Sequence, residues 1–436
     1  MKFRRPALVI SLLAVVLVSS NYLDNSVFSS GFTKNYPVVV CPPTLPGLSS
    51  QVSVSGVKTK YRYVASKKTT MSPTGFARLP IIKDAVLIDA VGVTPTIWQS
   101  RSGSWAGGTI CSGPISSQWF VGGTADITSK GRLLIVNSGL SEAIVDVSVW
   151  SESGAQAIKV LTIPARSYIA QGLDSLAPGE SKLVINVSAR AGRINAFVVD
   201  ERGKGLRRLG GDMVNSVEDV AKVQVIPAIP NQSSRNNRGA KAKYVLRVLA
   251  PGQLDARISV EILSADGRFI PVGLSQRVIK KGIVAEFRIE PNVPARAFAL
   301  RVTSDEPVVS SIFSKVVVSG RSDFLWSTPA APLQEMSIAV SGLTPLFVFA
   351  GDKIDVTLDT RFANGKHKII QVKASDIATW RVPNNARVVT IAQTNKGVTG
   401  GALVSSVNGY GYIPLTPGSV LTKASIPLSN IRVLNP

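Results

Sequence analysis

Two tryptophans enclose a short polar loop in the N-terminal third of the chain. Trp98 and Trp105 stand on either side of Arg101 and several Gly/Ser residues, a pattern typical of a β-hairpin loop. Exposed indoles beside a guanidinium would stack on sugar rings and hydrogen-bond their hydroxyls, so these three residues are a candidate ligand platform. The alternative is that both indoles face a core, because aromatic side chains bury much apolar area.

Residues for acid–base or metal chemistry are sparse. The single histidine, His367, lies in a polar stretch, whereas a Ser-His-Asp triad needs an oriented histidine beside a nucleophile. The tightest carboxylate group is Asp352, Asp355 and Asp359, without calcium-loop spacing. Asp355 and Asp359 would lie about 13 Å apart along a strand, farther than a glycosidase pair at about 5–10 Å. The sequence therefore predicts a non-enzymatic protein with no metal or cofactor.

The chain begins with an export pattern. Three basic residues precede the apolar run Ala7–Val18, which is the pattern of a signal peptide. This run is short for a membrane span of about 20 residues, but extension to Leu23 reaches the lower limit of about 17. A cleaved signal and a retained anchor both remain open, and in either case the rest of the chain is expected outside the cytoplasm.

The only two cysteines, Cys41 and Cys111, are expected to form a disulfide bond. An exported chain meets an oxidising environment, in which such a pair becomes oxidised. The bond would close a long loop and contribute roughly 4 kcal/mol by restricting the unfolded chain. Two buried free thiols are the alternative, and two cysteines with one distant histidine do not make a zinc site.

The chain is strongly basic, with a formal net charge of +22 and a pI of about 10.2. Such a charge attracts anionic wall polymers, phospholipid headgroups or nucleic acid, although export argues against nucleic acid as the physiological partner. Because the basic residues are scattered, a soluble basic surface without a specific partner is the alternative. The densest group, and the candidate contact with an anionic surface, comprises Arg202, Lys204, Arg207, Arg208, Arg235, Arg238, Lys241 and Lys243.

A strand–turn–strand pattern recurs at a spacing of roughly 90–115 residues, which predicts an array of like β-modules. The three copies are Leu183–Val199 with a turn at Arg190–Gly192, Phe298–Phe313 with a turn at Ser304–Pro307, and Val388–Val404 with a turn at Asn395–Gly397. About seven short strands per module, separated by Gly and Pro, favour an all-β fold of tandem immunoglobulin-like β-sandwiches. The expected organisation is a signal or anchor at 1–20, a spacer at 21–40, a β region with the disulfide at 41–118, sandwich modules at 119–201, 223–319 and 336–436, and a basic linker at 202–222.

Several short motifs are of structural type, with Gly, Trp and Asn positions and no catalytic signature. They are Cys111–Pro114, Trp119–Gly123, Leu134–Gly139, Val145–Val147 and Asp323–Trp326. Through these motifs the chain resembles an uncharacterised family of exported actinobacterial proteins, anchored or secreted, over about residues 105–330. The family has no established activity, so the resemblance implies location and fold class only.

The sequence favours a non-enzymatic envelope protein whose β-modules contact an anionic wall polymer, a membrane surface or a partner protein. Two alternatives remain: a carbohydrate-binding or carbohydrate-active protein that uses Trp98, Arg101 and Trp105, and an accessory subunit of an envelope polysaccharide enzyme. The oligomeric state is not predicted.

Overall fold

The computed structural model describes residues 38–89, 92–204, 207–232, 243–291, 293 and 295–419. All of them belong to one compact unit, Tyr36–Leu421. Within these ranges all regular secondary structure is β-strand, which confirms the all-β class. The same ranges contain no helix long and apolar enough to cross a membrane. The expected signal or anchor at 1–20 and most of the spacer at 21–40 lie outside the described residues.

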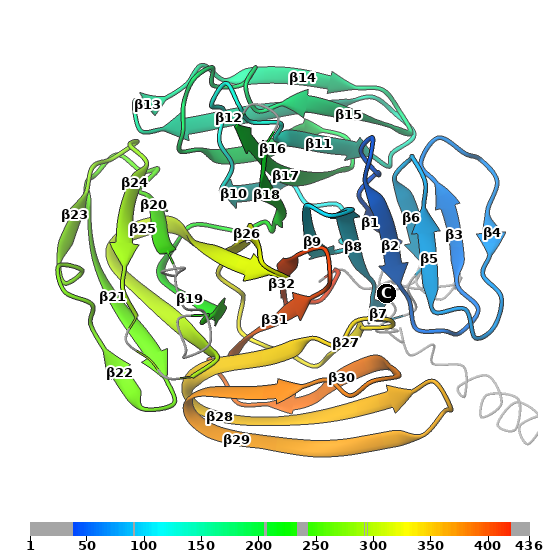
Figure 1. Cartoon of the computed structure of the whole chain (residues 1–436). Helices are drawn as coiled ribbons and strands as arrows, with labels where there is room; N and C mark the ends of the chain where they lie inside the picture. Colours follow the sequence, from blue (N-terminus) through cyan, green and yellow to red (C-terminus); the bar gives the residue numbers. More distant parts are fainter. Residues whose placement is uncertain are drawn as a thin grey trace, which may run out of the picture. The chain divides into compact units, whose positions relative to one another are not determined.

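The strands form four groups, here called sheet units 1 to 4 (Figure 1). Sheet unit 1 consists of two four-stranded sheets, β1-β6-β3-β4 and β5-β2-β8-β9, which share one apolar core. The Cys41–Cys111 disulfide lies in this core and confirms the expected pairing. Its strands are β1 (Val39–Cys41), β2 (Ser49–Ser53), β3 (Lys60–Tyr63), β4 (Thr70–Met71), β5 (Arg78–Ile81), β6 (Val86–Asp89), β8 (Thr96–Arg101) and β9 (Trp105–Ile110).

Sheet unit 2 is also a pair of sheets, β10-β16-β12-β13 with β14 on β12, and β15-β11-β17-β18. Burial in β12 alternates strictly, because one face of the strand packs on the core between the sheets. Its strands are β10 (Ser117–Val121), β11 (Arg132–Asn137), β12 (Ala143–Ser151), β13 (Gly154–Ala155), β14 (Lys159–Ile163), β15 (Ser167–Gly172), β16 (Val184–Ala191), β17 (Ile194–Lys204) and β18 (Arg207–Val214).

Sheet unit 3 is organised around one long strand, β25, which pairs with β19 and β21 in its first half and with β20 and β26 in its second. Its strands are β19 (Ala221–Pro230), β20 (Lys243–Leu249), β21 (Ala256–Ser264), β22 (Gly267–Phe269), β23 (Arg277–Ile279), β24 (Ala285–Ile289), β25 (Ala297–Val318) and β26 (Arg321–Ser327).

Sheet unit 4 is a seven-stranded sheet that takes one strand from early in the chain. β7 (Val93–Thr94) pairs in parallel with β27, so the first and last sheet units are joined. Hydrogen bonds from Ser53 Oγ to the Ser341 carbonyl (2.7 Å) and from Thr96 Oγ1 to the Ala339 carbonyl (2.8 Å) reinforce the junction. The other strands are β27 (Met336–Ala339), β28 (Leu346–Phe362), β29 (His367–Arg381), β30 (Ala386–Thr394), β31 (Thr399–Ser405) and β32 (Tyr410–Pro414).

The three copies of the expected repeat fold differently. In the third, the turn at Asn395–Gly397 is confirmed between β30 and β31. In the first, β16 and β17 are joined near Gly192 but enter different sheets. In the second, the expected turn at Ser304–Pro307 is wrong, because β25 runs through it without interruption. Pro307, which has no N–H to donate, lies where this strand passes from one sheet to the other.

The basic linker expected at 202–222 is also wrong. β17 continues to Lys204 and β18 begins at Arg207, with Glu201 opposite Gly211, so most of this segment is an antiparallel hairpin. Its basic residues are typical of a solvated linker, whereas the run Leu209–Val214 belongs to a strand and its last five residues are buried.

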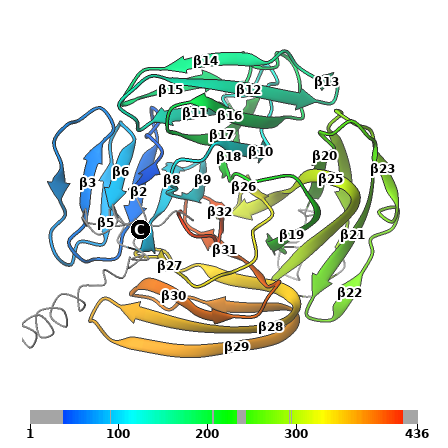
Figure 2. The same ribbon diagram turned by 180° about the vertical axis from the view of Figure 1, so that it is seen from behind.

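Four inner strands, β9, β18, β26 and β32, meet at the centre and are here called the hub (Figures 1 and 2). β9 contacts β18, β18 contacts β26, β26 contacts β32, and β32 returns to β9. Each neighbouring pair of sheet units shares an apolar cluster, so the units do not stand as separate tandem modules. The immunoglobulin-like detail of the expected fold is therefore not confirmed.

Candidate binding cavity at the hub

Two buried carboxylates connect the strands of the hub. Asp323, on β26, accepts hydrogen bonds from the backbone N–H groups of Gly211 on β18 (3.1 Å) and Tyr410 on β32 (3.3 Å). Asp212, on β18, accepts one from the N–H of Trp326 on β26 (2.7 Å). These hydrogen bonds link strands of three sheet units. Both carboxylate side chains are almost completely buried, so the links are shielded from solvent.

Trp326 lies beside this network and is fully buried. Its indole N–H donates to Asp200 Oδ2 at 2.9 Å, and the same carboxylate pairs with the Arg202 guanidinium at 2.7 Å. Two guanidiniums stack on the indole ring, those of Arg202 and Arg247, at 5.7 and 4.7 Å from its centroid. Arg202 thus balances the buried Asp200, as a buried charge requires, and Arg247 pairs with Glu286 at 2.7 Å.

Burial changes the ionisation of the two hub carboxyls. Removal from water raises the pKa of Asp323 to about 7, although backbone N–H donors, including those of Gly211 and Tyr410, act in the opposite direction. The pKa of Asp212 is raised well above its usual value, chiefly by burial and further by the nearby charges of Asp323 and Asp200.

The Asp323 carboxyl predicts a pH-dependent stability. Its pKa of about 7 in the folded state exceeds the ordinary 3.8, so between these values the native chain holds a proton that the unfolded chain has released. The contribution of this carboxyl to the free energy of unfolding therefore falls by on the order of 4 kcal/mol as the pH rises from about 4 to 7. We expect urea midpoints to show this decline in the wild type and a flatter profile in Asp323→Asn. Identical slopes in the two proteins would contradict the prediction.

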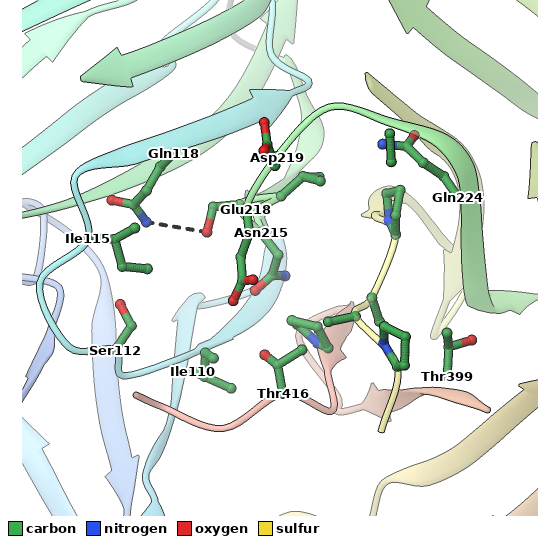
Figure 3. A pocket seen from close by; sticks show the side chains of 18 of the residues that line it. Ile110, Ser112, Ile115, Gln118, Asn215, Glu218, Asp219, Gln224, Thr399 and Thr416 are labelled. Carbon is green, nitrogen blue, oxygen red and sulfur yellow. Dashed lines mark hydrogen bonds between the residues drawn. The ribbon is translucent and has the colours of Figure 1, made fainter. Parts of the chain in front are cut away.

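A cavity of about 890 Å³ opens where the hub strands end. Figure 3 shows side chains from different sheet units around one open space: Ile110 at the end of β9, Asn215 just after β18, and Thr416 just after β32. The connection after β26 adds Pro329 and Pro332. Every hub strand thus leads into the same cavity, so all four sheet units contribute to its wall.

The polar side chains of this wall are held in place by hydrogen bonds. Gln118 donates to Ser216 Oγ at 3.3 Å and accepts from the N–H of Ala196 at 2.8 Å. Asn215 donates to the carbonyls of Gly108 on β9 (3.1 Å) and Tyr412 on β32 (2.8 Å). The wall is therefore fixed before any ligand arrives, which lowers the entropic cost of binding.

Apolar side chains and prolines make up much of the remaining wall, and the charged residues lie toward its edge. Glu218, Asp219 and Asp352 are exposed. Asp352 pairs with Arg301 at 2.6 Å and with Arg268 at 2.7 Å, which lowers the pKa of its carboxyl. A mostly apolar cavity with a few fixed polar groups is the usual form of a small-molecule site.

The aromatic platform expected at Trp98, Arg101 and Trp105 is not exposed. Trp98 packs in the cluster shared by sheet units 1 and 4, and Trp105 in the cluster shared by units 1 and 2. Arg101 pairs with the mostly buried Glu201 at 2.7 Å. The two indoles therefore fill interfaces between sheet units, which the sequence could not reveal because their partners are far away in the chain.

The candidate anionic-surface residues differ in their ion pairing and in their exposure to solvent. Arg202 pairs with Asp200 and stacks on Phe313, Phe324 and Trp326, so it is not available to an external anion. Arg207, Arg208 and Lys243 are exposed. The side chains of Lys204, Arg235, Arg238 and Lys241 lie outside the described part of the chain.

The carboxylate group and the histidine each have separate partners. Asp359 faces His367, with 3.2 Å from its oxygens to Nδ1. Asp355 interacts with Gln371 and Lys373, while Asp352 points to the arginines at the cavity edge. Among the described residues no three His, Cys, Asp or Glu side chains are placed to hold a metal ion.

The sequence does not point to the hub carboxylates or the cavity. Its only signals are Gly210-Gly211 before Asp212 and the motif Asp323–Trp326, whose residue types are structural. Glycine pairs that permit close backbone approach next to an isolated acid are the pattern that would have pointed to the hub.

Together these features define an all-β protein in which several sheets surround a central cavity. A protein-family model for a family of unknown function (DUF5719) matches residues 91–380, more than half of the chain, and the chain belongs to this family. Membership of an uncharacterised family is thereby confirmed. The comparison with curated proteins gave no match.

Proposed function

We propose that this chain is a non-enzymatic extracytoplasmic protein of the cell envelope that binds a ligand in the hub cavity. The observation that carries the proposal is the cavity of about 890 Å³ whose wall is assembled from all four sheet units and whose amide side chains are already oriented. A volume of this size suits a drug-sized ligand.

Two further features support the envelope location. The sequence begins with an export pattern, and the Cys41–Cys111 disulfide is typical of an oxidising compartment. The net charge of +22 would in addition hold the protein against an anionic wall polymer or membrane surface. Charge provides the general attraction in this proposal, and the cavity provides the specific recognition.

Sedimentation with isolated cell envelopes across a salt series tests both parts. Surface attraction is screened at high salt, because the Debye length falls from about 10 Å at 0.1 M to about 3 Å at 1 M. Binding that persists at high salt is assigned to the cavity, and we expect Thr416→Trp, which places an indole in the cavity, to remove it. Thr379→Trp is the matched control, since Thr379 is exposed on the outer strand β29.

Absence of sedimentation at any salt concentration would reject an envelope partner. Equal salt-resistant binding by Thr416→Trp and the wild type would reject the cavity as the binding site.

A carbohydrate ligand is the second candidate, because amides and hydroxyls dominate the polar groups of the cavity wall. In this hypothesis the carbohydrate binds in the cavity and not on the two tryptophans, which are buried. A neutral-glycan array read at high salt separates the two candidates, since glycan binding that Thr416→Trp abolishes supports the carbohydrate.

A further inference from the structure

One stretch of sheet unit 1 has an extreme charge pattern. Residues 57–83 contain seven Lys or Arg residues and no Asp or Glu. None of these seven side chains forms an ion pair with another described residue. These cations thus have no ion-pair partner within the described part of the protein, unlike Arg202.

The backbone folds the first part of this stretch, 57–76, into a two-stranded antiparallel ribbon, here called the basic ribbon, with Val57–Tyr63 alongside Thr70–Phe76. Lys60 lies opposite Met71, and Tyr61 lies opposite Thr70. Backbone hydrogen bonds extend the pairing beyond the strands, from the Ser72 N–H to the Thr59 carbonyl at 2.9 Å. β4 is the edge of its sheet, so this strand has no neighbour on its outer side.

The ribbon has one inner and one outer face. Tyr61 and Tyr63 pack on the core of sheet unit 1, and Thr59 is buried. Because side chains alternate along a strand, Lys58, Lys60 and Arg62 share the opposite face. Lys58 and Lys60 are exposed and Arg62 is half-buried.

The loop that joins the two strands adds two more cations. Lys67 and Lys68 are exposed. The loop is held by hydrogen bonds from Arg62 Nη1 to the Ser66 carbonyl (3.2 Å) and from the Lys68 N–H to Ser66 Oγ (3.0 Å). Asp89 stands across from Lys60 on β6 but is itself engaged in an interaction.

Exposed apolar side chains accompany these cations. Met71 is 47% exposed, and since it pairs with Lys60 it lies on the same face of the ribbon. Val57, at the far end, is 46% exposed, although the alternation places it on the side of Thr59 and Tyr61. Basic side chains combined with apolar ones suit a bilayer interface, where lysines meet lipid phosphates and apolar groups enter the headgroup boundary.

We propose that the basic ribbon docks onto an anionic phospholipid bilayer. The inference rests on the proposed envelope location and names the surface that would hold the protein there. Each Lys or Arg near an anionic leaflet contributes roughly a fivefold gain in affinity. An anionic wall polymer would engage the same cations but makes no use of the exposed Met71 among them, which is why the lipid surface is the better match.

The position of the ribbon in the chain agrees with this docking. β1 begins at Val39 and belongs to the same sheet as β3 and β4. The expected anchor at 1–20 precedes it by a segment, 21–37, that spans at most about 60 Å in any conformation. A retained anchor would therefore keep the ribbon close to the bilayer and raise its effective concentration there.

Lysine footprinting tests the proposal on the full-length protein. The protein is reconstituted with vesicles of phosphatidylcholine, with or without phosphatidylglycerol, and exposed lysines are acetylated and quantified by mass spectrometry. We expect phosphatidylglycerol to reduce labelling of Lys67 and Lys68 several-fold at low salt, with recovery at high salt. Lys222 and Lys243, exposed on sheet unit 3, serve as internal references whose labelling stays constant.

Two charge-reversal variants complete the experiment. Lys58→Glu/Lys60→Glu should restore labelling of Lys67 and Lys68 on anionic vesicles. Lys353→Glu/Lys366→Glu changes the net charge equally on exposed residues of sheet unit 4 and should leave the protection intact.

Equal labelling on neutral and anionic vesicles would overturn the proposal, as would equal loss of protection in both variants. Protection by soluble polyphosphate but not by phosphatidylglycerol would overturn it in favour of a wall-type polyanion. If these tests fail while the protein still sediments with envelopes, only the ribbon is rejected and the proposed function stands.

Discussion

Gly409→Ala is expected to destabilise the protein by at least about 3 kcal/mol, in the upper range for overpacking of a tight core. A Cβ at this position would lie 2.0 Å from the backbone nitrogen of Ala106 and 2.6 Å from Asp323 Oδ2. The backbone of β9 cannot yield without moving the hub, and the Asp323 carboxylate is fixed by hydrogen bonds from two other strands. Equilibrium unfolding in urea measures the loss.

Gly252→Ala is the matched control for this prediction. A Cβ at Gly252 meets no atom within 4 Å, and its backbone is not in the left-handed region. The same chemical change should therefore alter stability by only a few tenths of a kcal/mol at this exposed position. Similar urea midpoints for Gly409→Ala and the wild type would show that the hub strands are not packed as described.

Loss of the Cys41–Cys111 disulfide is expected to cost about 4 kcal/mol. The bond closes a loop of 70 residues and connects β1 of one sheet to the end of β9 in the other sheet of the same unit. Both cysteines are fully buried, so Cys41→Ala/Cys111→Ala also removes a small amount of packing. The urea midpoint of this double variant, compared with the wild type, measures the effect.

The control for this prediction is chemical reduction. A reducing agent should lower the midpoint of the wild type nearly to that of the double variant and should leave the double variant unchanged. If reduction does not change the wild-type midpoint, the disulfide contributes no stability.

Local patterns were sufficient for the parts of the fold that depend on neighbouring residues. The strand–turn–strand pattern over Leu183–Val199 predicted two strands, which are β16 and β17, because a strand with one face on a core has alternating apolar residues. Asn395–Gly397 predicted a turn through its own conformational preference. The expectation failed at Ser304–Pro307, where a turn-like sequence lies within β25, because pairing with four other strands outweighs local preference.

The candidate site depended on contacts that the sequence does not display. The sequence around Trp98 and Trp105 is compatible with an exposed platform or with a core. Both indoles are buried because sheet units 4 and 2 pack against unit 1. No local pattern marks Asp212 or Asp323 as buried, yet each accepts hydrogen bonds from backbone N–H groups more than 80 residues away in the chain.

The sequence by itself determined the all-β class, the cysteine pair, the basic character and the family, since these follow from composition, periodicity and short motifs. Only the tertiary structure decided that the sheet units close around a hub, that a cavity forms where the four inner strands end, and which cations remain unpaired. The physical reason is that burial and ion pairing are set by segments distant in the chain. Two equally basic stretches can therefore differ completely, with Arg202 enclosed at the hub and Lys58 and Lys60 facing solvent.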